Sequence, residues 1–132
     1  VDLVLRCKGA DRAVLVTDAI SAAGMPDGKY RLGTFEVTVT GDRCELDGRL
    51  AGSVLKLERA VRNVMQYSGW NLGQCVRLAT ANPAGVVGES KRGILKAGVR
   101  ADINVLSPNG EIVECFAGGQ AMIGKSGSRA IG

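Results

Sequence analysis

Apolar and polar residues follow different patterns in successive parts of the chain, and each pattern predicts an element. Residues 13–16, Ala-Val-Leu-Val, form an unbroken apolar run, which predicts a strand covered on both faces, as in a parallel sheet. Residues 29–46 instead alternate, with Phe35, Val37 and Val39 separated by polar residues. Such alternation is typical of a strand with one exposed face, so a β-hairpin is predicted at about 29–46.

Helical spacing dominates the middle of the chain. A first helix is predicted to begin after Ser53, a favourable N-cap, and to end at Gly69. Its apolar positions recur every three or four residues: Val54, Leu57, Val61, Val64 and Met65. A second helix is predicted after the N-cap Asn71. The dipeptide Asn82-Pro83 disfavours its continuation, so a turn is expected up to Gly88.

The two ends of the chain have patterns of their own. Residues 2–7 predict the last turn of a helix, with Gly9 as its C-cap. In the C-terminal part, turns at 108–110 and 118–119 separate short apolar runs and predict a small β unit. Its expected strands are Ile103–Leu106, Glu111–Phe116 and Gln120–Ile123. The tail 125–132 is rich in Gly and Ser, and we expect it to be mobile.

These elements together predict an α/β fold that is incomplete within this chain. A strand buried on both faces needs a neighbour on each side, and the sequence offers no second strand of that kind. Its 132 residues suffice for one ordinary domain. However, the chain begins at Val1 rather than Met, directly inside an amphipathic pattern. We therefore expect it to be the C-terminal part of a longer protein.

The absence of histidine is the most informative feature of the composition. Histidine is the commonest ligand of catalytic zinc and the usual proton carrier near neutral pH. Ser-His, Cys-His and His-metal mechanisms are therefore excluded within this chain alone. The cysteines are widely spaced: Cys7, Cys44, Cys75 and Cys115. Their spacing argues against a zinc site and against a disulfide framework, and we expect small buried thiols in a reducing cytosol.

The charge distribution bears on partners and location. The net charge of +4 comes from scattered basic residues, so no nucleic-acid partner is predicted, and a weak attraction to anionic substrates is the better interpretation. The sequence shows no secretion signal and no apolar stretch near the ~20 residues that a membrane span requires. We therefore predict a cytoplasmic protein without a membrane partner.

Asp18 is the strongest candidate for chemistry. It follows the apolar run 13–16 and would emerge at the C-terminal end of a strand, where parallel α/β barrels carry their active sites. A carboxylate at such a position can take a proton from a metal-bound water and return it to a leaving group. The structural alternative is a cap or turn residue that binds nearby backbone N–H groups.

The segment Leu50-Ala51-Gly52 is a second candidate. Gly52 would let the backbone approach a ligand closely, and the N–H groups at the start of the expected helix would face a substrate oxygen. The alternative is a plain capped helix start at Ser53. Asp102, which precedes a predicted strand, is a weaker candidate, and a structural role in a turn explains it more simply.

Three motifs are specific in combination: Val16-Thr17-Asp18-Ala19-Ile20, Pro26-Asp27-Gly28-Lys29-Tyr30-Arg31-Leu32-Gly33 and Leu50-Ala51-Gly52-Ser53. Together they resemble the N-acetylglucosamine-6-phosphate deacetylases of the amidohydrolase superfamily. A fourth motif, Gly93-x-Leu95-x-x-Gly98-x-x-Ala101-Asp102, occurs in many amidohydrolases and says little about substrate. The resemblance covers about residues 8–122.

The resemblance implies the C-terminal portion of a (β/α)8 barrel over residues 1–92 and part of a small β-sandwich over 93–124. It implies that Asp18 is the catalytic aspartate on the last barrel strand, and that Leu50, Ala51 and Gly52 lie against the bound substrate. A divalent metal, zinc or similar, would be held by a glutamate and two histidines on earlier strands. This leaves Asp18 as the one candidate metal contact in the chain.

The implied reaction is hydrolysis of N-acetylglucosamine 6-phosphate to glucosamine 6-phosphate and acetate. The implied partners are this amino-sugar phosphate and a second subunit in a homodimer. The chain alone is not expected to be active, because the metal ligands are missing. Two alternatives stay open: an amidohydrolase acting on a different amide, and a non-catalytic remnant or binding module. Lys56 and Gly85 depart from the family pattern, and both lie on predicted helices or helix ends.

Overall fold

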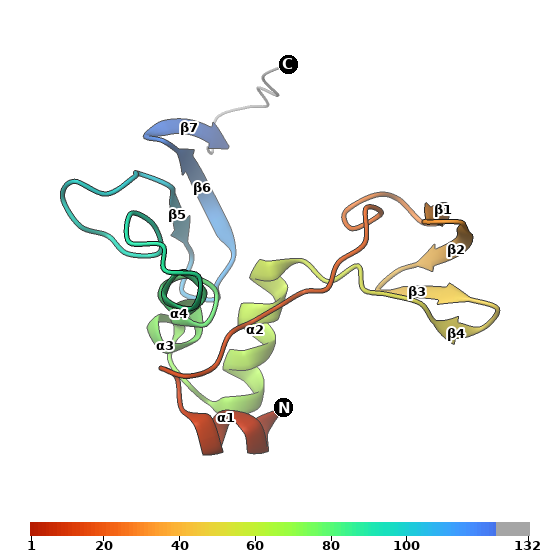
Figure 1. The fold of residues 1–132 in the computed structure, drawn as a ribbon, viewed down its shortest axis with the longest axis horizontal. Helices are drawn as coiled ribbons and strands as arrows, with labels where there is room; N and C mark the ends of the chain where they lie inside the picture. The colour runs from red at the N-terminus through yellow and green to blue at the C-terminus, as the bar shows by residue number, and fades with distance from the viewer. Residues whose placement is uncertain (124–132) are drawn as a thin grey trace. The chain divides into compact units, whose positions relative to one another are not determined.

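Short helices and antiparallel strands make up the chain (Figure 1). The structure is a computed structural model that describes residues 1–123, so the predicted mobile tail, 125–132, lies outside the described residues. The chain divides into two compact units, one formed by Val16–Ala60 and the other by Val1–Leu15 with the chain from Val61 onward. None of the helices within residues 1–123 has the length and apolar character that a bilayer span requires.

The unit Val16–Ala60 is built around a four-stranded antiparallel sheet. Its strands follow one another in the order β1 (Gly28–Leu32), β2 (Phe35–Thr40), β3 (Arg43–Leu46) and β4 (Arg49–Leu50). Val37 and Val39 point into a small core with Ala22 and Cys44, whereas Phe35, at the turn end of the strand, is exposed. The predicted hairpin is confirmed for β2 and β3, but residues 29–40 form two paired strands, β1 and β2, rather than one, and β4 extends the sheet further.

Two hydrogen bonds tie the loop before β1 to the sheet. The Asp27 carboxylate accepts a hydrogen bond from Gly41 N at 2.9 Å, which joins the loop to the turn between β2 and β3. The Tyr30 hydroxyl donates to the Pro26 carbonyl oxygen at 2.6 Å. The loop is therefore anchored at its C-terminal end by residues that belong to the Pro26–Gly33 motif.

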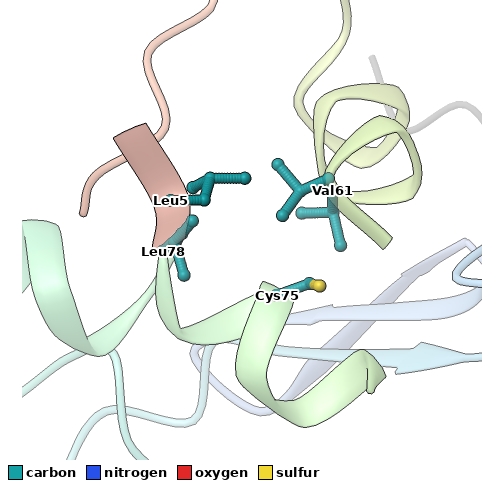
Figure 2. Packing of buried hydrophobic residues seen from close by; sticks show 5 residues of the cluster. Leu5, Val61, Cys75 and Leu78 are labelled. Carbon is teal, nitrogen blue, oxygen red and sulfur yellow. The ribbon is translucent and has the colours of Figure 1, made fainter. Parts of the chain in front are cut away.

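An apolar core holds the other unit together (Figure 2). It receives side chains from α1 (Asp2–Lys8), α2 (Leu57–Ser68) and α3 (Leu72–Arg77) and from the residue after α3: Leu5, Val61, Val64, Cys75 and Leu78. Figure 2 shows Leu5 and Leu78 close together and Val61 directed toward them from α2. Leu78 has no exposed surface, so this cluster is the main packing contact among the three helices.

The start of α3 and the end of α2 lie where the sequence predicted them, whereas the start of α2 does not. Asn71 and Gln74 form a capping box with bonds of 2.9 and 3.1 Å, which confirms Asn71 as the N-cap of α3. Gly69 follows the end of α2 as predicted. However, α2 begins at Leu57 and not after Ser53, because the Ser53 hydroxyl accepts from Leu55 N at 3.0 Å in a local turn.

A further helix, α4 (Ala81–Val86), stands where a turn was expected. Pro83 lies within its first turn. Backbone N–H groups in a first turn have no intrahelical partner, so proline costs little there. The prediction that Asn82-Pro83 limits the second helix was therefore wrong: α3 already ends at Arg77, and a separate helix that includes Pro83 begins at Ala81. Gly9 does follow the end of α1 with a positive φ of 71°, as predicted.

Residues 13–16 are not a strand buried on both faces, contrary to the sequence prediction. Val14 and Val16 are exposed at 39% and 77%, while Leu15 packs against the helical core. Leu15 N donates to the Leu78 carbonyl at 2.9 Å, and Asn82 Nδ2 donates to the carbonyls of Ala10 and Ala13 at 2.7 Å each. The run is extended and held on one side, because no strand within residues 1–123 pairs with it.

The C-terminal β unit agrees with the prediction in type and position. β5 (Ile103–Leu106), β6 (Ile112–Ala117) and β7 (Gln120–Ile123) form a separate antiparallel sheet in that order. Register shifts interrupt both pairings, one between Val105 and Leu106 and the other between Cys115 and Phe116. Each such irregularity increases the local twist of a sheet.

Asp102 has the structural role that the sequence favoured for it. Its carboxylate accepts from Arg100 Nε and from Gly118 N at 2.8 Å each, and from Arg92 Nε at 3.4 Å. It thereby joins the loop before β5 to the turn between β6 and β7. The Arg100 hydrogen bond, followed by the Gly118 N–H, holds the pKa of Asp102 below its ordinary value of 3.8.

Asp102 is therefore expected to make stability depend on pH. The pKa of Asp102 is lower in the folded state than in the unfolded state. Its carboxylate therefore stabilises the fold fully at pH values above the unfolded-state pKa, and this stabilisation is lost as the pH falls through the folded-state pKa. Asp102→Asn should lower the free energy of unfolding at about pH 6, and the difference from wild type should shrink toward about pH 3. Urea unfolding at both pH values measures this, with Asp47→Asn as the control. A difference that stays constant with pH would contradict the ion-pair role.

The cysteines only partly match the expectation of buried thiols. All four are free; Cys44 and Cys75 are buried, Cys115 is half-buried and Cys7 is exposed. Cys7 is exposed because only Leu5 of α1 is fully covered by the helical core. Burial raises the pKa of the Cys75 thiol, which disfavours its reactive thiolate form and fits a packing role.

Candidate functional site

Asp18 lies exposed at the end of the extended run, in an uncommon backbone conformation. Its φ of +50° places it in the left-handed region, which aspartate and asparagine enter more readily than other residues with side chains. Within residues 1–123 its carboxylate makes no hydrogen bond or ion pair. The cap role given as the alternative is therefore not seen, and the carboxylate is available to a ligand.

The backbone brings the two candidate segments together. Ala19 and Ser53 form a parallel bridge, and Ile20 N donates to the Ser53 carbonyl at 2.9 Å. In Figure 1 the orange segment after Asp18 accordingly runs beside the segment that leads toward α2. Since Asp18 and Gly52 immediately precede the bridged residues, two motifs more than thirty positions apart become neighbours within one compact unit.

The three residues of the second segment have different environments. Leu50 ends β4 and is 74% exposed, so its side chain is accessible to a ligand. Ala51 N donates to the Cys44 carbonyl at 2.8 Å, which uses its N–H to join the sheet. Gly52 is half-buried with a φ of +128°. The helix N-terminus predicted beside Gly52 is not there, because α2 begins at Leu57 and its free N–H groups lie farther along the chain.

Three of the basic residues in this unit, Lys29, Arg43 and Arg59, form exposed ion pairs. Lys29 pairs with Glu36 at 2.8 Å, and this hydrogen bond raises the pKa of Lys29. Arg59 contacts Asp42 and lowers the pKa of that carboxyl group. Pairs this exposed contribute little to stability. They tie cations to the sheet and leave Asp18 outside any ion pair among the described residues.

The chain does not make a metal site by itself. Among the described residues, no group of three or more Cys, Asp or Glu side chains is placed to hold a metal ion, and the sequence contains no histidine. Asp18 is available as a single oxygen ligand, which is fewer than the three protein ligands typical of a catalytic zinc. The residues present therefore do not fit a complete metal centre.

A family comparison agrees with this arrangement. The model of the amidohydrolase family matches residues 13–122, which include Asp18, Gly52 and both sheets. The chain belongs to the amidohydrolase family. This confirms the resemblance seen in the sequence motifs.

Similar proteins match most of the chain, and most of them are much longer. It is 37% identical over 116 residues to a putative N-acetylgalactosamine-6-phosphate deacetylase of Escherichia coli K12, covering 86% of this chain and 70% of that protein. It is 41% identical over 103 residues to the N-acetylglucosamine-6-phosphate deacetylase of Lysinibacillus sphaericus, covering 77% of this chain but only 27% of that enzyme.

Solved structures of deacetylases contain a region with the same fold as this chain. The N-acetylglucosamine-6-phosphate deacetylase of Thermotoga maritima matches 94% of this amidohydrolase chain with a TM-score of 0.85 and 34% identity. A mutant of the Mycobacterium smegmatis enzyme, in complex with N-acetyl-D-glucosamine-6-phosphate, matches 92% with a TM-score of 0.84 and 31% identity. The chain spans 34% and 33% of these two structures. Its α/β fold with antiparallel sheets thus resembles about a third of a deacetylase.

The sequence motifs selected Asp18 and Leu50–Gly52 as candidates but did not identify Ile20, which packs beside both segments. Ile20 stands in the Val16–Ile20 motif, and its side chain packs against the sheet core of its unit. A Cβ atom at position 52 would lie 2.7 Å from Ile20 Cγ2. The only sequence signal for this contact was the presence of a β-branched residue in one motif and a glycine in the other.

Proposed function

We propose that the complete protein carrying this chain hydrolyses the acetamide of an N-acetyl amino-sugar 6-phosphate. The preferred substrate is N-acetylglucosamine 6-phosphate, and the products are glucosamine 6-phosphate and acetate. The observation that carries the proposal is the exposed, unpaired Asp18 beside the Leu50–Gly52 segment, in a chain that belongs to the amidohydrolase family. The names of the similar proteins supply the substrate class.

In this proposal Asp18 acts as general base and then as general acid. It accepts a proton from the water whose oxygen bonds to the acetamide carbon, and it returns a proton to the nitrogen as the carbon–nitrogen bond breaks. Acetate and a free amine result, so atoms and charge balance without an oxidant or reductant. The exposed Leu50 side chain and the adjoining backbone of Ala51 and Gly52 form one wall of the substrate site.

The remaining parts of the site are proposed to come from outside residues 1–132. Amidohydrolases are generally metal-dependent, and a divalent ion such as zinc would require histidine ligands that this chain lacks. We assign residues 1–92 to the end of a (β/α)8 barrel and 93–124 to part of a small β-sandwich. A homodimer and a cytoplasmic location complete the proposal, the latter supported by four free thiols.

A panel of amides tests the proposal. We expect acetate release from N-acetylglucosamine 6-phosphate, with kcat/KM at least about 100-fold lower for the sugar without phosphate, because a site built for a polar group rejects an analogue that lacks it. N-acetylgalactosamine 6-phosphate belongs in the panel, since two similar proteins carry its name. Equal rates with and without phosphate would contradict the substrate class, and release from a cyclic amide alone would indicate a different amidohydrolase.

A further inference from the structure

Gly52 is constrained by two features of the structure that have nothing to do with a ligand. Its φ of +128° is a conformation that residues with side chains rarely adopt. A Cβ atom at this position would also lie 2.7 Å from Ile20 Cγ2, well inside the about 3.5–4.0 Å at which carbon atoms normally pack. The missing side chain of Gly52 therefore leaves room for Ile20.

Ile20 in turn fixes the backbone next to Asp18. Its side chain packs against the core formed by Val37, Val39 and their neighbours, and its N–H donates to the Ser53 carbonyl. The parallel bridge between Ala19 and Ser53 lies one residue from Asp18. Displacing Ile20 would thus strain the bridge and shift the carboxylate that follows the extended run.

We propose that Gly52 and Ile20 are a pair of positioning residues that set the place of Asp18. Because Gly52 has no Cβ, the segment 51–53 can approach Ile20 closely enough to form the parallel bridge. This assigns to Gly52 a role in kcat, in addition to the substrate wall, and it rests on the proposed deacetylase function. Misplacing a catalytic group by about 1 Å can cost about 100-fold in rate.

The test is a double-mutant cycle in the complete protein, with acetate release from N-acetylglucosamine 6-phosphate as the readout. Gly52→Ala should lower kcat by about 10- to 100-fold while KM changes less than about threefold. Ile20→Ala removes Cγ2, so Gly52→Ala combined with Ile20→Ala should recover at least about fivefold in kcat over Gly52→Ala alone. A merely structural role would lower the unfolding free energy of Gly52→Ala but leave kcat per folded molecule unchanged.

Gly48→Ala is the matched control. Gly48 also has a positive φ, of +74°, but no atom lies within 4 Å of the place that its Cβ would take. It should therefore report the milder strain of an alanine in the left-handed region, without a clash, and keep kcat within about twofold of wild type. Circular dichroism and thermal unfolding of each variant show whether it is folded. The cycle of unfolding free energies measures the clash between positions 52 and 20 separately from its effect on kcat.

The outcomes separate this proposal from the proposed function. A wild-type protein that releases no acetate would overturn the deacetylase function, and the positioning role with it. An active wild type whose double variant has a kcat no higher than that of Gly52→Ala would overturn only the positioning role of the Gly52–Ile20 pair, whatever the unfolding free energies. A Gly52→Ala variant with raised KM and unchanged kcat would show that Gly52 acts through substrate contact instead.

Discussion

Asp18→Asn should lower kcat of the complete protein by about 10²- to 10⁴-fold, the range that a positioned general acid–base group contributes. The loss should appear in kcat and kcat/KM together, since proton transfer occurs in the transition state. Asparagine suits this test because it keeps the size of the side chain and tolerates the φ of +50° at this position. Acetate release under saturating N-acetylglucosamine 6-phosphate measures the effect.

Asp47→Asn is a closely matched control for this variant. Asp47 is exposed, belongs to the same compact unit and has a φ of +51°. It differs from Asp18 in lying in the turn between β3 and β4. The control should keep full activity, and both variants should unfold at the wild-type temperature. An Asp18→Asn protein that turns over within tenfold of wild type would refute the general-base assignment.

The sequence predicted the antiparallel parts of the fold well because their signals are local. The alternation around Val37 and Val39 and the turns that flank β6 specify partners only a few residues away. The prediction of a strand buried on both faces at residues 13–16 was wrong for the opposite reason. An apolar run indicates burial but does not say by what, and the described residues cover Ala13 and Leu15 only in part and leave Val14 and Val16 exposed. Strands of a parallel sheet depend on partners distant in sequence.

The same distinction applies to the candidate site. Asp18 and the Leu50–Gly52 segment could be selected from their residue types and motifs, whereas their proximity depends on a bridge between positions 19 and 53. The predicted helix start at Ser53 was wrong because the Ser53 hydroxyl accepts a hydrogen bond from Leu55 N in a local turn. Propensity ranks serine as a good cap but does not decide which nearby N–H it binds.

Leu78→Ala should be the most damaging single substitution for stability among the core positions, lowering the free energy of unfolding by about 2–5 kcal/mol. Leu78 is completely buried and touches a cluster drawn from α1, α2 and α3 (Figure 2). Truncation to alanine removes three carbon atoms, so apolar burial is lost and a cavity is left in the core. Helices this short depend on tertiary packing for their stability, so the loss affects all three. Urea unfolding of the complete protein measures the loss.

Leu95→Ala provides the same chemical change on the surface of the same unit. Leu95 is 80% exposed, so its truncation should alter the unfolding free energy by no more than about 0.5 kcal/mol. If Leu78→Ala and Leu95→Ala proved equally mild, the central packing role of Leu78 in the helical core would be refuted.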